Sequence, residues 1–285
     1  MQICRSRQAV RDCVGDWRAA GDRVVLVATM GALHEGHMQL VAHGRDWLAA
    51  HGGGRVIASI FVNPAQFDRQ ADLALYPRDE DADIAMLRAQ GCDAVFLPEV
   101  GDIYRPGAQT VVEVTGLSRI LMGRLRPGHF RGVTTIVTKL FNIVDPDAAT
   151  FGEKDYQQLT IVRQMVADLD MSVQIIAVPT VREPDGLAMS SRNRRLSPQD
   201  RAAAPILSQA LDLGQRLVAQ GARPDTIRRR IRTLLRDQPR ARIRSVDIRD
   251  AADLSRITRI DRPVVILLSV LFSDVLLIDQ RVAHP

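Results

Sequence analysis

The chain has 285 residues, of which 46 % are hydrophobic and 25 % are charged, and its formal net charge is +5. This length and composition are typical of a globular protein with one large or two modest domains. The longest apolar run, residues 263–272, is about half as long as the roughly 20 residues of a membrane-spanning helix. Three widely spaced cysteines without a CxxC pair argue against a zinc ribbon or a disulfide framework. Because the N-terminus also lacks the apolar core of a secretory signal, we expect a cytoplasmic protein.

Apolar runs alternate with amphipathic segments through the first part of the chain. Continuous apolar residues, typical of strands covered on both faces, predict strands at residues 24–28, 56–62, 94–97, 148–151 and 173–178. Helical spacing predicts helices at residues 5–20, 39–50, 81–90, 133–144 and 157–169. This alternation predicts an α/β fold with a parallel sheet, right-handed crossovers and helices on both faces. Sheets of this kind bind ligands at the carboxyl ends of their strands.

The pattern changes after about residue 180. Residues 198–220 and 225–236 are predicted to be helices. Strands are predicted at residues 244–249, 264–272 and 275–278, the last two joined as a hairpin across Ser273 and Asp274. Because this is an α+β pattern, we expect a smaller second domain, with the division between residues 1–181 and 182–285.

The stretch TMGALHEGH, residues 29–37, follows the first predicted strand. Gly31 and Gly36 permit unusual dihedral angles and a close approach of the backbone to a ligand. A helix that begins near Glu35 would present unpaired N–H groups and a positive dipole end to an anion. His34 and His37 would share one face of its first turn and could donate to phosphate oxygens. Phosphate chemistry is the favoured interpretation; a metal shared by the two histidines and a purely structural turn are the alternatives.

Four further segments carry polar residues where strands end or helices begin. SIFVNPAQF ends in Gln66, whose amide suits a hydroxyl or carboxylate of a small substrate. TFGEKDYQQL contains Lys154, one of only two lysines, which suits a point contact to a phosphate. GLAMSSRN, residues 186–193, could close on a triphosphate. RPGHFRGV, residues 126–133, could be another anion-facing helix start with Arg126 or Arg131 as a partner of the anion. For each of these four segments, a purely structural turn or linker is the alternative explanation.

Nearly all cationic side chains are arginines, and they are dense between residues 228 and 244. We interpret this run as the solvated face of a helix. A nucleic-acid-binding surface is the alternative, but no aromatic residues or known nucleic-acid motif accompany the arginines.

The five motifs TMGALHEGH, SIFVNPAQF, RPGHFRGVTTIV, FGEKDYQQL and MSSRN, in this order, closely resemble the pantothenate synthetases, or pantoate–β-alanine ligases. HEGH is similar to the HxGH signature of the nucleotidyltransferase superfamily, and MSSR to its KMSKS-type loop. The resemblance implies a Rossmann-like ATP-binding domain, a smaller C-terminal lid and a homodimer. It also implies a two-step reaction with Mg²⁺: pantoate and ATP give pantoyl adenylate and pyrophosphate, and β-alanine then displaces AMP to give pantothenate.

The resemblance also implies roles for particular residues. His37 would be the proton donor, with His34, Lys154, Ser190, Ser191 and Arg192 stabilising charge on the phosphates. Gln66 and Gln158 would hold pantoate, and Gln66 would also meet β-alanine. The implied ATP contacts are Met30, Gly31, Ala32, Leu33, His34, Glu35, Gly36, His37, Gly152, Glu153, Lys154, Asp155, Val181, Met189, Ser190, Ser191 and Arg192. No metal ligand is assigned.

Two positions depart from the family pattern. Ala28 stands where the family usually has proline, which loses a fixed φ but no reactive group. Met122 stands where a glutamate is common, which puts any role of a carboxylate there in doubt. Two other functions stay open: a nucleotidyltransferase for another acid or a phosphorylated alcohol, and a non-catalytic nucleic-acid-binding protein.

Overall fold

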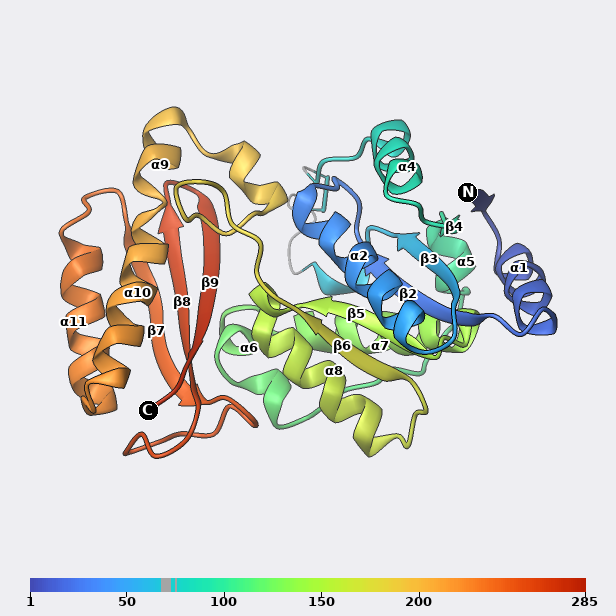
Figure 1. The fold of residues 1–285 in the computed structure, drawn as a ribbon. Coiled ribbons are helices and arrows are strands. Elements are labelled where there is room, and N and C mark those ends of the chain that lie inside the picture. The colour runs from blue at the N-terminus through green and yellow to red at the C-terminus, as the bar shows by residue number, and fades with distance from the viewer. Residues whose placement is uncertain (68–72, 75) are drawn as a thin grey trace. The chain divides into compact units, whose positions relative to one another are not determined.

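The computed structural model describes residues 1–67, 73–74 and 76–285 (Figure 1). The chain forms two compact units, each described by itself. The first contains Met1–Gly152 and Ile161–Val178, and the second contains Glu153–Thr160 and Pro179–Pro285. The expected division into an ATP-binding domain, residues 1–181, and a lid, residues 182–285, stays a prediction. The two compact units do not show which part of the chain binds ATP or which part closes over it.

The first unit contains a six-stranded sheet in the order β1-β4-β3-β2-β5-β6. Its strands are β1 (Gln2–Cys4), β2 (Arg23–Thr29), β3 (Gly54–Ile60), β4 (Ala94–Phe96), β5 (Ala148–Gly152) and β6 (Gln174–Val178). All neighbouring strands are parallel, as predicted. β1 escaped prediction because it has only three residues and pairs with β4 alone, at the edge of the sheet.

Helices cover both faces of this sheet, as predicted. The described helices of this unit are α1 (Arg7–Ala19), α2 (Glu35–Ala50), α4 (Glu80–Ala89), α5 (Val100–Ile103), α6 (Met122–Leu125) and α7 (His129–Val144), together with α8 (Tyr156–Asp168) from Ile161 onward. Buried residues of α2 and α4, such as Val41 and Leu87, share one cluster with Val25 of β2. Val24 and Leu26 alternate with Val25 and are also fully buried, so they face the opposite side. There α1 and α7 contact each other and β2.

The second unit contains an antiparallel sheet in the order β7-β8-β9. Its elements are α9 (Pro198–Ala203), α10 (Ile206–Ala219), α11 (Pro224–Arg236), β7 (Arg242–Asp250), β8 (Val264–Phe272) and β9 (Val275–Ala283). Fully buried Leu207, Ile227 and Ile231 of the helices share a core with Ile266 of β8. The predicted hairpin across Ser273 and Asp274 is confirmed.

The single helix predicted for residues 198–220 is wrong. α9 ends at Ala203 and α10 begins at Ile206, with Ala204 and Pro205 between them. Pro205 has no N–H to donate to the preceding turn, and its ring crowds the carbonyl four residues earlier, so the helical hydrogen bonds are interrupted there. The described residues also form short 3₁₀ turns, which are η1 (Pro64–Gln66), η2 (Leu117–Arg119), η3 (Glu153–Asp155) and η4 (Ser191–Arg195).

Candidate active site

The segment TMGALHEGH lies at the point where the strand order of the first sheet reverses. From β2 the sheet continues through β3 and β4 on one side and through β5 and β6 on the other. Open parallel sheets bind ligands at such a switch point, outside the carboxyl ends of the strands. β2 ends at Thr29 and α2 begins at Glu35, so residues 30–34 form the loop at this position. Ala28, which stands where the family usually has proline, pairs with Ser59 in the parallel ladder between β2 and β3. A proline at this position would have no N–H to donate to the ladder.

His34 and His37 cap the N-terminus of α2 reciprocally. The main-chain N–H of Gly36 donates to Nδ1 of His34 (3.2 Å), and the N–H of His34 donates to Nδ1 of His37 (3.3 Å). The two ring centroids are 4.1 Å apart and the ring planes are inclined by 43°. The predicted helical start near Glu35 and the shared face of the two histidines are therefore present in the structure.

These caps determine the tautomer of both imidazoles. A ring nitrogen that accepts an N–H bond carries no proton, so Nδ1 is the acceptor in both rings. In the neutral ring the proton then lies on Nε2, which makes Nε2 a hydrogen-bond donor. The first turn of α2 thus carries two neutral Nε2–H donors beside its own main-chain N–H groups, which is a suitable environment for an anion.

A buried carboxylate, Asp83 of α4, holds the loop that leads to these histidines. Its Oδ2 accepts the N–H of Ala32 (2.9 Å) and its Oδ1 accepts the N–H of Leu33 (2.7 Å). Gly31 and Ala32 both have positive φ, 82° and 51°. No motif in the sequence assigns a role to Asp83. A signal was present, because Asp83 lies one turn before Leu87 on the buried face of its helix, and a buried charge requires partners.

Gln66, predicted to contact pantoate, is almost fully buried at the end of η1. Asn63 has a fixed orientation: its Oδ1 accepts the N–H of Ala65 (3.2 Å), and its Nδ2 donates to the carbonyl of Gly132 (3.1 Å). Asn63 Nδ2 also donates to Oε1 of Gln66 (3.1 Å), so Gln66 turns its Nε2 toward Met30. Because the amide nitrogen has a second N–H besides the one directed at Met30, the donor end of Gln66, rather than its carbonyl, suits a ligand.

Tyr104 and the segment RPGHF complete this support. The Tyr104 hydroxyl donates to Oδ1 of Asn63 (2.8 Å), and burial raises the pKa of Tyr104 to about 12, which keeps it a donor. Arg126 donates to the main-chain carbonyl of Gln66 (3.2 Å), and Nδ1 of His129 lies 2.8 Å from the same oxygen. A Cβ at Gly132 would lie 2.3 Å from the carbonyl oxygen of Ala65, so only glycine permits α7 to approach η1 this closely. Residues 126–132 thus fix Gln66.

In the second unit, the segment that contains MSSRN folds back as a short two-stranded ribbon. The N–H of Met189 donates to the carbonyl of Val181 (2.9 Å), so these two predicted ATP contacts lie side by side. Asn193 holds the C-terminal end of the MSSRN segment, since its Nδ2 donates to Glu183 (2.9 Å) and to the carbonyl of Ala188 (3.1 Å). Ser190 caps η4 by accepting the N–H of Arg192 (3.2 Å).

Three residues predicted to act on phosphates line one small cavity of this second unit: Lys154, Ser190 and Arg192. Both cations are half-buried. Among the described residues, neither Lys154 nor Arg192 has an acidic partner within ion-pair distance. Asp279 also lines this cavity, but it is paired with Arg182, so the two half-buried positive charges are well suited to bind an anionic ligand.

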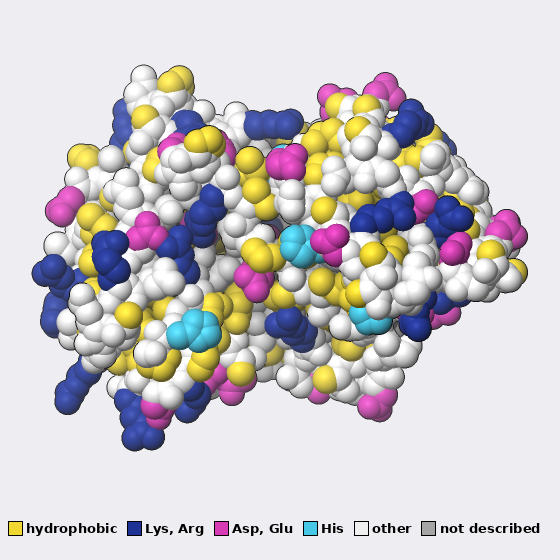
Figure 2. All heavy atoms as spheres, in the orientation of Figure 1, with side chains coloured by type: hydrophobic (Ala, Val, Ile, Leu, Met, Phe, Trp, Pro, Cys, Tyr) yellow, Lys and Arg dark blue, Asp and Glu magenta, His cyan; other side chains and the backbone are white. Residues whose placement is uncertain are grey.

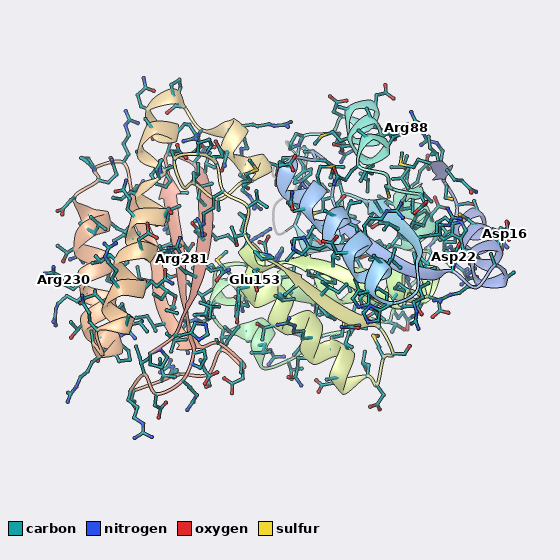
Figure 3. The ribbon with its side chains drawn as sticks, viewed as in Figure 1. Asp16, Asp22, Arg88, Glu153, Arg230 and Arg281 are labelled. Atoms are coloured by element: carbon teal, nitrogen blue, oxygen red, sulfur yellow. The ribbon has the colours of Figure 1, made fainter. Side chains whose placement is uncertain are left out.

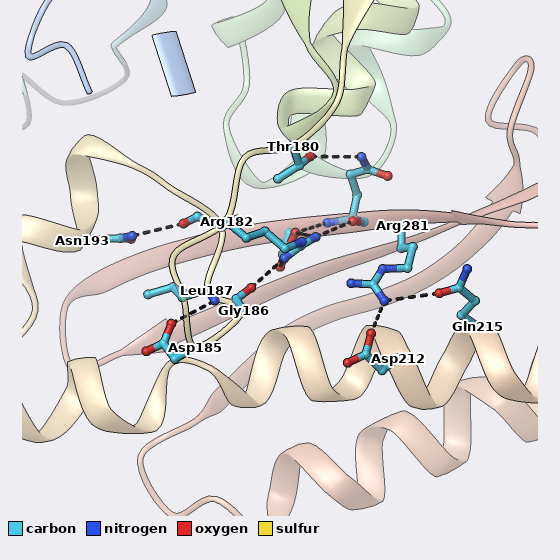
Figure 4. Close-up of polar contacts among 12 residues, drawn as sticks. Thr180, Arg182, Asp185, Gly186, Leu187, Asn193, Asp212, Gln215 and Arg281 are labelled. Atoms are coloured by element: carbon cyan, nitrogen blue, oxygen red, sulfur yellow. Dashed lines mark hydrogen bonds and ion pairs between the residues drawn. The ribbon is translucent and has the colours of Figure 1, made fainter. Parts of the chain in front are cut away.

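The neighbouring arginines differ, because carboxylates neutralise them, as Figure 4 shows for Arg182. Arg182 forms a forked pair with buried Asp279 (2.7 and 3.0 Å). Arg201 contacts Glu183 and Asp185 (2.5 and 2.6 Å), and its hydrogen bond is the largest cause that lowers the pKa of Asp185. These pairs hold the loop and the sheet, whereas Lys154 and Arg192 stay available in the cavity.

The remaining predicted residues fall into two groups. Met30, Leu33, Glu35 and Gly36 belong to the loop and the first turn of α2, and Gly152 ends β5 in the first unit. Glu153, Lys154 and Asp155 form η3, and Gln158 lies half-buried on the first turn of α8, in the second unit. The structure therefore brings residues 30–37 together with Gln66 in one unit, and Lys154 together with residues 189–192 in the other.

No cluster of three or more His, Cys, Asp or Glu side chains that could hold a metal ion occurs in the described part of the chain. The two Nδ1 atoms at the HEGH turn are occupied by main-chain N–H groups, which does not favour the metal interpretation for this pair. No helix in the described ranges has both the length and the apolar character needed to cross a membrane.

The first part of the arginine-rich segment lies on α11, where Arg230 is exposed and points away from the sheet (Figure 3), whereas Arg242 and Arg244 belong to β7. Arg281, by contrast, pairs with Asp212 of α10. On the face drawn in Figure 2, Lys and Arg side chains lie in separate groups with acidic and uncharged side chains between them. This arrangement favours a solvated surface over a nucleic-acid-binding stripe.

The first unit has an HEGH turn at the switch point of a parallel sheet, and the second has an MSSR loop beside a basic cavity, so the chain is an α/β protein with two candidate phosphate-binding segments. Residues 2–282 match the family described as pantoate-beta-alanine ligase. A pantothenate synthetase of Bartonella bacilliformis is 46 % identical over 284 residues, 99 % of each chain. A crystal structure of pantothenate synthetase from Thermus thermophilus has a TM-score of 0.90 at 40 % identity and covers 100 % of both chains.

A third relative has been crystallised with ligands. The structure of pantoate-beta-alanine ligase from Francisella tularensis, complexed with beta-gamma ATP and beta-alanine, has a TM-score of 0.80 at 30 % identity. It covers 99 % of this chain and 97 % of its own. The chain therefore belongs to the pantoate–β-alanine ligase family, and the predicted α/β fold with a small α+β second part is confirmed.

Proposed function

We propose that this chain condenses pantoate with β-alanine to give pantothenate, through pantoyl adenylate, with release of AMP and pyrophosphate from ATP. The observation that carries the proposal is the pair of Nε2–H donors at the switch point, in a chain similar over its full length to pantothenate synthetases. The family relationship supplies the substrates, and the ligands of the Francisella tularensis relative agree with them.

In the first step, a carboxylate oxygen of pantoate attacks the α-phosphorus, and the bond from this phosphorus to the β-phosphate oxygen breaks. The carboxylate is already a nucleophile, so no base is required. Catalysis is then mainly positioning and stabilisation of phosphate charge. We assign the stabilisation to His34 and His37 as neutral donors, and to Lys154, Ser190, Ser191 and Arg192 as phosphate contacts.

In the second step, the amine of β-alanine attacks the acyl carbon, the bond to AMP breaks, and the amine loses a proton. Gln66, whose Nε2 faces Met30 and carries a second N–H, suits an oxygen acceptor of pantoate, and Gln158 is the second pantoate contact in the proposal. The further ATP contacts are residues 30–37, 152–155, Val181 and 189–192. Residues 1–181 would form the ATP-binding domain and residues 182–285 a lid that excludes water from the adenylate.

We also propose that Mg²⁺ binds together with ATP. Magnesium in nucleotide-dependent enzymes is held largely by substrate phosphates and water, with one or two carboxylates. The absence of a three-residue metal cluster from the described part of the chain fits that mode. We also propose a cytoplasmic homodimer, which sedimentation of the purified protein would test.

The direct test is pyrophosphate release from MgATP by purified protein, with and without pantoate and β-alanine. We expect release to depend on pantoate, and AMP and pantothenate to appear only when β-alanine is added. Folded protein that releases pyrophosphate with another acid, but not with pantoate, would contradict the substrate assignment.

A further inference from the structure

Asp83 is a buried carboxylate whose two oxygens both serve the HEGH loop. It lies in the first turn of α4, 3 % exposed, and it accepts the N–H groups of Ala32 and Leu33. These residues are about fifty positions away in the sequence, so no local turn explains the contact. A buried carboxyl group that accepts two main-chain N–H bonds is firmly held.

The loop adopts a conformation that would be unfavourable without such a partner. Gly31 and Ala32 have φ of 82° and 51°, and a non-glycine residue in the left-handed region costs energy. Consecutive left-handed residues turn successive N–H groups toward the same side, where an anion can accept both. Asp83 supplies that anion. A Cβ at Gly31 would lie 2.9 Å from Oδ2 of Asp83, so the glycine and the carboxylate fit each other.

We propose that Asp83 is a positioning residue that holds residues 30–33 in this strained turn and so sets the place of the two Nε2–H donors. The residue after Leu33 is His34, the N-cap of α2, and its N–H is in turn bound by His37. No flexible segment separates the carboxylate contact from the imidazoles. The inference rests on the proposed function only for its kinetic consequence; the loop geometry is independent of it.

The variant Asp83→Asn separates this role from simple packing. The amide has nearly the same volume, but only one acceptor oxygen, and its NH₂ group would face a main-chain N–H. One hydrogen bond is lost and one N–H is left buried against another donor. We expect the turn to relax while the helix and the sheet keep their packing.

Two measurements on purified full-length protein test the proposal. Hydrogen exchange should be faster in D83N than in wild type at the amides of Ala32 and Leu33, with the rest of the sheet unchanged. The adenylation half-reaction should show a rise of about tenfold or more in KM for ATP or a similar loss of kcat, as expected for a lost charge-assisted bond. KM for pantoate should change less than about threefold, because Gln66 is held by Asn63 and residues 126–132. A lower melting temperature alone would not produce this split between ATP and pantoate.

The matched control is Asp81→Asn, an exposed acid in the same first turn of α4. It removes the same charge from the helix terminus, and both measurements should match wild type. Asp83→Glu keeps the carboxylate on a longer stem and should recover part of the ATP affinity.

Hydrogen exchange at the amides of Ala32 and Leu33 in the wild-type protein tests the structural part of the proposal even if D83N does not fold. Exchange as fast as in open loops would overturn the proposal, and so would a folded D83N with normal exchange and normal KM for ATP. If wild type releases no pyrophosphate with pantoate, the proposed function fails, while the exchange experiment still supports or refutes the role of Asp83.

Discussion

The two units of this protein provide groups for phosphate chemistry in different ways. In the first unit the candidate groups are neutral imidazoles and a glutamine amide, fixed by main-chain groups and by buried Asp83 and Asn63. In the second unit they are the cations Lys154 and Arg192, half-buried and without an acidic partner among the described residues. Donors fixed before the reaction suit charge that develops in a transition state, because they need no reorganisation. Cations on long side chains suit the ground-state charge of a polyphosphate.

The comparison predicts that the largest kinetic effects arise in the first unit. His37→Ala removes one fixed Nε2–H donor, and we expect the adenylation rate to fall by at least about a hundredfold, with the fold retained. Single-turnover formation of pantoyl adenylate measures this rate. His43→Ala, a half-buried histidine on the same helix, is the control and should stay near wild type. Near-normal turnover by a folded H37A protein would remove His37 from the mechanism.

The cations of the second unit should affect ATP binding more than the chemical step. For Lys154→Ala and Arg192→Ala we expect KM for ATP to rise roughly 10- to 100-fold, the range for a lost charge-assisted hydrogen bond. Lys154→Arg should recover little, since a guanidinium fork does not reproduce a compact ammonium. Arg229→Ala, on the exposed face of α11, tests whether general positive charge matters and should have little effect. A fall in kcat with unchanged KM for ATP would contradict this difference between the two units.

A smaller effect is expected when the hydrogen bond that Asn63 donates to Gln66 is reversed in direction rather than lost. Asn63→Asp has the same shape but cannot donate, so Gln66 would turn its Nε2 toward the new carboxylate and its Oε1 toward the ligand. We expect KM for pantoate to rise about tenfold, the size of one lost hydrogen bond to a charged group, with KM for ATP nearly unchanged. Initial rates with each substrate varied provide the test, and Asn142→Asp on the exposed side of α7 is the control. Equal changes in both KM values would indicate general damage.

The same contrast explains what the sequence could predict. Apolar runs and glycines identified five of the six parallel strands and placed TMGALHEGH at a strand end, because these signals are local. The fixed partners of the site, Asp83, Asn63 and Tyr104, were not assigned roles there. Each acts through a contact that joins distant segments, such as Asp83 to Leu33 or Asn63 to Gly132, and no spacing rule reports such a contact.

Other outcomes follow the same rule. The chemistry of proline predicts the break at Pro205, but the apolar periodicity continues across it and favours a single helix. The implied roles of Lys154 and Arg192 came from the resemblance; their lack of an acidic partner could be seen only in the structure. The assignments of individual site residues remain predictions until the variants are measured.

The smallest expected effect concerns the ionic support of the second unit. Asp200 of α9 accepts hydrogen bonds from Ser273 (2.7 Å), Ser197 (2.8 Å) and Arg240 (2.9 Å), and so joins the start of α9 to the β8–β9 turn. These bonds, with that from Ser273 the largest cause, lower the pKa of Asp200 below its ordinary value. Because the folded state binds this proton less readily than the unfolded state, the contribution is complete above the unfolded pKa of about 4. It is lost as the pH falls further, through the folded pKa.

Asp200→Asn should therefore lower the melting temperature by a few degrees at pH 7, and the difference from wild type should shrink below about pH 4. Thermal unfolding followed by circular dichroism at both pH values measures this difference. Asp237→Asn, at the exposed end of α11, is the control for the loss of one acid and should unfold like wild type at pH 7. The turn at Gly31 and Ala32 is held by Asp83 in the first unit, whereas Asp200 lies in the second, so hydrogen exchange at the turn should be equal in D200N and wild type. A D200N protein that melts like wild type at pH 7 would show that ionic contacts contribute little to the second unit, and the contrast between the units would then lie only in Lys154 and Arg192.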